Sequence, residues 1–126
     1  MFAVLGNHER RYKEPAAQAM DNFGIRLLAD TVVAIERDGD AIYLAGIYDS
    51  FVYDSLTVQP AEKVNEEEFV MLLCHTPDYA ERSSTTADIV FSGHTHGGLI
   101  KWIQPLIALF NGGFVDGLYR ANERTQ

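Results

Sequence analysis

The stretch ADIVFSGHTH (residues 87–96) joins a short apolar run to a loop that holds two of the chain's four histidines. Its first half, 87–91, has the length and apolar character of a buried strand. In its second half Gly93 precedes His94 and His96, and two further glycines follow them. On a helix, side chains at i and i+2 would point about 200° apart. A tightly turning loop can instead bring both imidazoles to one small ion, because glycines permit sharp turns and leave room.

The same arrangement occurs twice more. The apolar run 2–5 leads into Asn7, His8 and Glu9, and the apolar run 69–74 leads directly into His75. If these strands are neighbours that run in the same direction, all four histidines meet at one edge of a sheet. Active sites of α/β folds lie at the carboxyl ends of strands. The pattern therefore predicts an α/β fold with a site at that edge.

The remaining segments complete the predicted fold. A helix is expected at 14–23, since Pro15 suits a first helical turn and Gly24 a helix end. A short strand follows at 25–28. The β-rich runs 31–37 and 41–47 are separated by Asp-Gly-Asp, a strong hairpin signal. Short helices are predicted at 59–65 and 77–82. An apolar segment at 99–110 is interrupted by Pro105, and a last strand or hairpin arm is predicted at 114–119.

Composition limits the classes of function. The chain has 126 residues and a formal net charge of −8, which predicts a single domain without the basic surface that nucleic acid requires. The acidic run 66–68 reads as a solvated face or, less simply, as a partner-binding patch. One cysteine, Cys74, predicts a reducing, cytoplasmic location. No apolar run is long enough to cross a bilayer. The apolar start of the chain predicts that it is part of a longer protein.

Each histidine also has a structural interpretation. An isolated His-x-His occurs in ordinary surface loops, and a lone histidine after a buried strand, such as His75, is often a hydrogen-bonded structural residue. Asn7 and its neighbours could form an Asx-type turn. Against this stands a metal-site interpretation, in which imidazoles bind a divalent ion. In the metal-site interpretation, the Asn7 side-chain oxygen is a further ligand to the ion, and Glu9 orients the neighbouring His8 ring. Taken singly, the residues leave both interpretations open.

Taken together, GNHE at 6–9, the lone His75 and GHTH at 93–96 resemble the calcineurin-like metallophosphoesterases. Their pattern runs D-x-H, G-D, G-N-H-[DE], a lone H and G-H-x-H, and the order and strand-end placement agree here. The resemblance spans roughly residues 2–120. GHTHGG before an apolar segment looks like the bacterial single-domain branch, some members of which act on lipid-linked phosphates. The implied fold is a four-layer α/β/β/α sandwich with mixed sheets, of which residues 1–126 would form one incomplete domain.

The resemblance assigns a role to each residue. Asn7, His75 and His94 would bind the second of two metal ions, and His96 the first. His8 would protonate the leaving group, supported by Glu9. The implied cofactors are divalent Mn, Fe, Zn or Ni, and the implied substrate is a phosphate ester, monoester or diester. The metals clamp the phosphate oxygens and activate a water for in-line attack, while His8 acts as a general acid.

Two blocks of the pattern are absent. No D-x-H occurs in the chain, and Gly39-Asp40 follows GNHE in a predicted turn, so it does not replace the missing G-D. Without these carboxylates the first metal keeps only His96. We therefore weigh two hypotheses. The chain is either the C-terminal part of a phosphoesterase with a site impaired in isolation, or a non-catalytic remnant or interaction module that binds at most one ion.

The missing blocks would lie beside the strand at 2–5 and leave an apolar edge unpaired. Exposed edges tend to pair with another chain, so we expect a homo-oligomer or a partner chain that covers this edge. The segment 99–110 has two readings of its own. It packs as core or as an oligomer interface, or it makes peripheral contact with a membrane, which Lys101 and Trp102 would suit.

Overall fold

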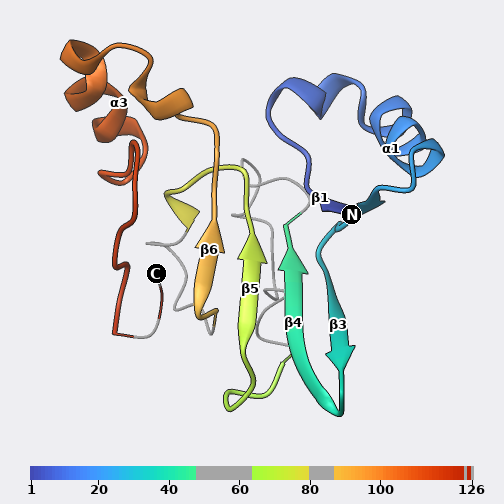
Figure 1. The fold of residues 1–126 in the computed structure, drawn as a ribbon. Helices are drawn as coiled ribbons and strands as arrows, with labels where there is room; N and C mark the ends of the chain where they lie inside the picture. Colours follow the sequence, from blue (N-terminus) through green and yellow to red (C-terminus); the bar gives the residue numbers. More distant parts are fainter. Residues whose placement is uncertain (48–63, 80–86, 124, 126) are drawn as a thin grey trace.

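A four-stranded mixed sheet forms the centre of the molecule in the computed structural model, which describes residues 1–47, 64–79, 87–123 and 125 (Figure 1). Its strand order is β3-β4-β5-β6. The pair β4–β5 and the pair β5–β6 are parallel, whereas β3 runs antiparallel to β4. The strands are β3 (Thr31–Arg37), β4 (Asp40–Gly46), β5 (Val70–Leu73) and β6 (Ile89–Phe91). The predicted α/β class with mixed strands is confirmed.

The hairpin between β3 and β4 turns where the sequence predicted. Arg37 pairs with Asp40, so only Asp38 and Gly39 form the turn. Their φ angles are 54° and 94°. Both lie in the left-handed region, as a type I′ turn requires, and this turn matches the twist of the flanking strands.

A second, two-stranded unit precedes the hairpin. It pairs β1 (Phe2–Ala3) in parallel with β2 (Arg26–Leu27) across helix α1 (Lys13–Asn22). The helix ends as predicted, because Gly24 takes a φ of 68°. Backbone hydrogen bonds from Gly24 to Asp21 and from Ile25 to Met20 close the end, in the pattern of a Schellman motif. A turn of 3₁₀ helix, His8–Arg11, links β1 to α1.

Apolar clusters cover both faces of the sheet. One face carries a cluster that includes Leu72 and Cys74, and the other carries Leu28, Val33 and Leu44. Strand β5 supplies both, since Val70 and Leu72 are buried on one face while Met71 and Leu73 pack on the other. The prediction of a strand covered on both faces is confirmed. Phe2 and Val4 pack against the second cluster, which fixes the loop after β1 relative to β5.

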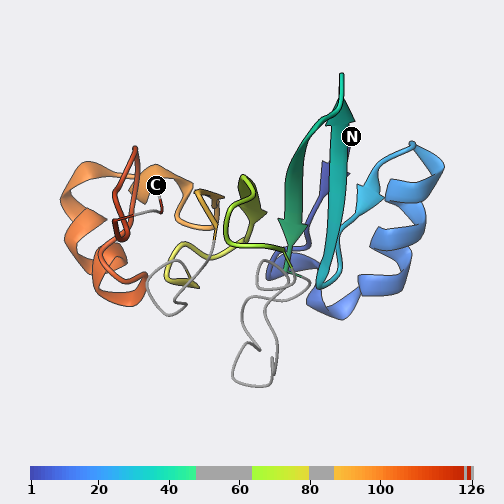
Figure 2. The same cartoon turned by 90° about the horizontal axis from the view of Figure 1, so that it is seen from below.

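Helices α1 and α3 lie beyond opposite edges of the sheet in both views (Figures 1 and 2). Helix α1 lies beyond β3, and α3 (Gln104–Phe110) lies beyond β6. Pro105 stands at the start of α3, where its missing N–H is tolerated, and a 3₁₀ turn, Lys101–Ile103, precedes it. Pro105 therefore starts this helix after the turn rather than breaking one.

Two expectations were wrong. Residues 114–119 form neither a strand nor a hairpin arm. Gly113 and Gly117, with φ of 88° and 102°, bend the backbone away from extended geometry. The segment 99–110 does not pack as core, because α3 has no buried residue and Leu99, Trp102 and Phe110 are exposed; its interpretations as an oligomer interface or a membrane contact stay predictions. The predicted helix at 59–65 lies outside the described residues except at 64–65, which are not helical, and half of the one at 77–82, residues 80–82, also lies outside them. Among the described residues, no helix is long and apolar enough to cross a membrane.

Candidate metal centre

Three predicted ligands from three strand ends come together. The Asn7 side-chain oxygen lies 2.8 Å from His75 Nε2 and 3.3 Å from His94 Nδ1. The two imidazoles stand edge to face, with ring centroids 5.1 Å apart. Asn7 follows β1, His75 follows β5 and His94 follows β6. The predicted convergence of these loops is therefore observed, but the three strands are not neighbours in one sheet, because β1 pairs with β2 in a separate sheet.

Backbone pairing holds the two histidine loops side by side beyond the strands. Cys74 N donates to Phe91 O at 3.0 Å, and Gly93 N donates to His75 O at 3.0 Å. The β5–β6 ladder thus continues into the loops and sets the spacing of His75 and His94. Such placement on backbone hydrogen bonds gives a site more precision than free loops provide.

Gly6 allows the loop after β1 to pass close to the His75 ring. A Cβ atom at this position would lie 2.8 Å from His75 Cε1 and 3.1 Å from Glu9 Oε2. Real Cβ atoms do not approach that closely, so only glycine lets the loop after β1 pass the His75 ring. Gly6 N also donates to Glu9 Oε2 at 2.9 Å. Gly6 therefore places both the asparagine and the carboxylate beside His75.

The GHTH loop has an unusual backbone. His94 and His96 have φ angles of 68° and 53°, in a region that non-glycine residues seldom occupy. Thr95 lies between them with a φ of −73°. Its hydroxyl donates to Val115 O at 2.6 Å and ties the loop to the following segment. Left-handed residues held in place by such ties are common at functional sites, and here both are the histidines predicted to act.

The environment lowers the pKa of both central imidazoles below its ordinary value. For His75 burial is the main cause and His94 adds to it, while the Glu9 carboxylate opposes them. For His94 burial again comes first, and Asp78 opposes it. His8 and His96 also lower the pKa of both rings. The two rings therefore favour the neutral state in which imidazole binds metals.

The donor set fits one divalent ion. Two ligand atoms about 2.1 Å from a common ion stand roughly 3.0–3.4 Å apart at square to tetrahedral angles, close to the separations of Asn7 Oδ1 from the two ring nitrogens. Among the described residues, no three His, Cys, Asp or Glu side chains are grouped closely enough to hold a metal. The third atom of this group is the Asn7 amide oxygen, and no carboxylate of the described residues joins it.

The other predicted residues lie around this group rather than in it. His8 and His96 are exposed, yet both act electrostatically on His75 and His94. Glu9 accepts the Gly6 hydrogen bond and acts on His75, in addition to its predicted support of His8. The roles of His8, Glu9 and His96 stay predictions.

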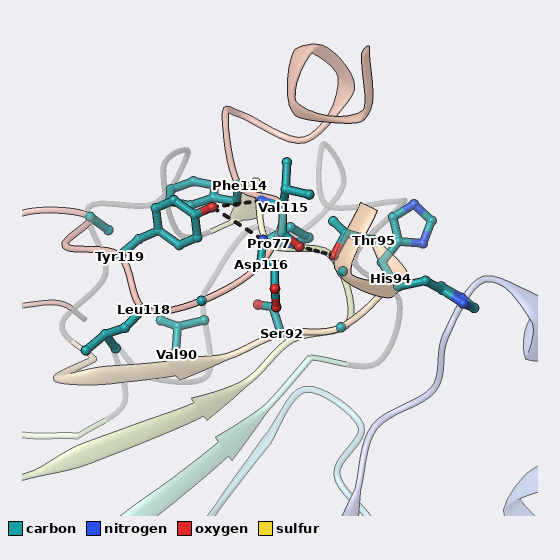
Figure 3. Close-up of a pocket in the computed structure, with 15 residues that line it drawn as sticks. Pro77, Val90, Ser92, His94, Thr95, Phe114, Val115, Asp116, Leu118 and Tyr119 are labelled. Atoms are coloured by element: carbon teal, nitrogen blue, oxygen red, sulfur yellow. Dashed lines mark hydrogen bonds between the residues drawn. The ribbon is translucent and has the colours of Figure 1, made fainter. Parts of the chain in front are cut away.

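Sequence reasoning missed three residues near the site. Asp78 acts on His94, Thr95 anchors the GHTH loop, and Asp116 lies near Gly97, where an added Cβ would be 3.8 Å from its carboxyl carbon. Asp78 lies three positions after His75, which was the one available signal. The GHTH loop and Asp116 also line a cavity of about 470 Å³ (Figure 3).

Comparison with known proteins gives relatives in bacteria, several of which carry the name "Uncharacterized metallophosphoesterase". One from Helicobacter pylori is 32% identical over 133 residues, covering 99% of this chain and 35% of its own length. One from Aquifex aeolicus is 33% identical, covering 81% and 41%. One from Campylobacter jejuni is 32% identical, covering 99% and 34%. The chain matches no protein-family model and no solved structure.

The chain thus spans between about a third and two fifths of the length of these relatives. The region matched in the Helicobacter pylori relative spans almost the whole chain, so it includes the positions of GNHE, the lone histidine and GHTH. The use of divalent metal ions follows in general terms from the relatives' name. On these similarities, the chain belongs to the metallophosphoesterases.

Proposed function

We propose that this chain supplies part of the site of a metal-dependent phosphoester hydrolase. Asn7, His75 and His94 would hold one divalent ion, and His96 would serve a second. Metal ions in such a site stabilise charge on the phosphoryl group and activate water. His8 would donate a proton to the departing oxygen, and Glu9 would hold the local backbone and balance charge near His75.

The observation that carries the proposal is the position of Asn7 Oδ1 within hydrogen-bond distance of both imidazoles. Three donors from distant parts of the sequence meet at one point, as an ion requires. The lowered pKa of His75 and of His94 supports the same reading, because protonated imidazole binds no metal. A structural hydrogen-bond cluster would not need two partly desolvated histidines edge to face.

A second candidate is a module that binds one ion and has no hydrolytic activity. One observation favours it: among the described residues, no carboxylate joins the Asn7–His75–His94 group. A phosphoesterase site with two ions needs acidic ligands to offset their charge. Both candidate functions predict one ion bound by Asn7, His75 and His94, and only the hydrolase predicts a second ion.

Calorimetric titration with Zn²⁺ or Mn²⁺ tests the shared part. We expect one ion per chain, with binding lost in Asn7→Ala and retained in the matched control Asn22→Ala, which alters an exposed residue at the end of α1. Equal binding by both variants would contradict the site.

Hydrolysis separates the candidates. With Mn²⁺ present, we expect the isolated chain to cleave bis-p-nitrophenyl phosphate little faster than the metal alone. Adding a polypeptide with the missing D-x-H and G-D blocks should raise the rate if the chain is part of an enzyme. Robust hydrolysis by the isolated chain would show instead that its site is already complete.

We further propose that an edge beside β1 is covered by a second copy or a partner chain. Strand β1 pairs with β2 on one side, and β1 has no other strand partner among the described residues. Unpaired backbone donors and acceptors favour strand addition. Light scattering at high protein concentration would show a dimer or larger species, and a strict monomer would argue against coverage by a second copy.

A further inference from the structure

A cavity on the far side of the GHTH loop has the features of a leaving-group site. Its volume is about 470 Å³, within the range of small-molecule sites. His94 and His96 line one part of it. Figure 3 shows Tyr119, Phe114 and Leu118 at the opposite end from His94. A phosphate ester held at the histidines could therefore extend its organic group into this cavity.

The far end of the cavity has an aromatic wall. Phe114 and Tyr119 stand edge to face, with ring centroids 5.1 Å apart and planes at 90°, and Val90 and Leu118 add apolar surface. Aromatic side chains arranged in this way pack well against a third ring. Aliphatic chains gain only contact area at such a wall, so a planar ring fits better.

Hydrogen bonds fix this wall in position. The Tyr119 hydroxyl accepts from Val115 N and Asp116 N, each at 3.3 Å. Thr95 Oγ1 donates to Val115 O at 2.6 Å. The wall is thus tied directly to the residue between the two histidines, and the cavity keeps a set distance from the candidate metal centre.

The polar group beside the wall indicates what the ring carries. Asp116 lines the cavity, and an ionised carboxylate only accepts hydrogen bonds. It would attract an amino or hydroxyl group and repel an anionic one. The net charge of −8 adds to the repulsion of polyanions.

We infer that the chain prefers phosphoesters whose leaving group is an aromatic or heteroaromatic ring with a hydrogen-bond donor, bound between the Phe114–Tyr119 wall and Asp116. The inference rests on the proposed function, because the phosphoryl end is placed by the metal centre. It adds a substrate class that the histidines alone do not determine.

Binding of phosphonates, which are not hydrolysed, tests this preference without catalysis. With the chain saturated by Zn²⁺, we expect phenylphosphonate to bind about tenfold more tightly than methylphosphonate, since the ring buries apolar surface. An amino group on the ring, in 4-aminophenylphosphonate, should tighten binding about threefold more through a hydrogen bond.

Substitutions of cavity residues test whether the preference for phenylphosphonate arises from this cavity. Leu118→Ala should lower the phenyl-to-methyl ratio, and Asp116→Asn should remove the gain from the amino group. Leu118 is 83% exposed, so its truncation leaves the fold intact. The matched control is Leu109→Ala, at a leucine that is 76% exposed and does not line the cavity.

The outcomes are distinguishable. Equal affinity for methyl- and phenylphosphonate, with zinc bound, would overturn this inference and leave the proposed function standing. A phenyl preference that Leu118→Ala does not change would also overturn it. Absence of zinc binding would overturn the proposed function and this inference with it.

Discussion

The buried and exposed halves of the histidine cluster are built differently. His75 and His94 are partly buried, share Asn7 as a neighbour and are set by a continued β5–β6 ladder. His8 and His96 are exposed, and their influence on the central pair is electrostatic. This chain therefore brings together the three side chains of the proposed first metal position. The second position has its histidine but not a surrounding set of donors among the described residues.

The largest effect is expected at Gly6. Gly6→Ala places a methyl group 2.8 Å from the His75 ring, so the ring or the loop must move. We expect loss of metal binding and destabilisation by about 1–3 kcal/mol, as for overpacked sites. Calorimetric titration and urea unfolding measure the two effects.

Gly93→Ala is the matched control. Its added Cβ would meet His75 Nδ1 at 3.9 Å, an ordinary contact, and its φ is not left-handed. This variant should bind metal nearly as the parent chain does. Similar losses in both variants would mean that close approach at Gly6 is not what organises the buried half.

The loss of Zn²⁺ affinity on removing one histidine should differ between the partly buried pair and the exposed pair. His75→Ala and His94→Ala should each weaken Zn²⁺ affinity by at least about tenfold, because each removes one of three donors to a preformed site. His8→Ala and His96→Ala should change it by less than about threefold. A titration of the four variants under one condition would contradict the division if His96→Ala were as damaging as His94→Ala.

A smaller effect is expected from pH on the metal-free chain. The pKa of His75 and His94 is lowered in the folded state, so the unfolded chain binds protons more readily near the ordinary value of about 6.5. Stability contributed by the neutral rings is present above that pH. It is lost as the pH falls through the pKa of the folded state.

Urea midpoints measured between pH 7.5 and 5.5 would show this loss. The double variant His75→Gln/His94→Gln should lose less stability over the same interval, because the two imidazoles with a lowered pKa are gone. An identical pH dependence in the two proteins would mean that the buried half carries no such linkage.

The smallest effect is expected from a substitution in helix α3. Phe110 is 75% exposed on α3, and we propose that this apolar segment contacts another chain or a membrane surface. Phe110→Asp should reduce self-association in light scattering or recovery with liposomes in flotation. Phe23→Asp, at an equally exposed phenylalanine after α1, is the control. No change in either assay would leave α3 without a role in contact.

The sequence was sufficient for the parts of the fold that local chemistry determines. The Asp-Gly turn, the helix end at Gly24 and the alternation along β5 each follow from short-range rules. The meeting of His75 and His94 was predictable because the parallel neighbours β5 and β6 end at one sheet edge. Asn7 reaches them from the separate β1–β2 pair, which the sequence did not indicate.

Other features depend on distant contacts that the sequence does not reveal. The role of Gly6 arises from a ring that lies far along the chain. The wall formed by 114–119 is tied to the GHTH loop by a hydroxyl hydrogen bond from Thr95 to Val115, a contact between segments that the sequence does not reveal. The exposure of 99–110 likewise depends on which segments pack beside β6. The amino-acid pattern alone does not predict that packing.

The most direct test of the central claim is X-ray absorption spectroscopy of the zinc-loaded chain, combined with its metal content. We predict one ion per chain, bound by two imidazole nitrogens and at least one oxygen, with one imidazole fewer in His75→Ala. A bound ion with one imidazole or none in the parent chain would contradict the claim that Asn7, His75 and His94 form a metal site.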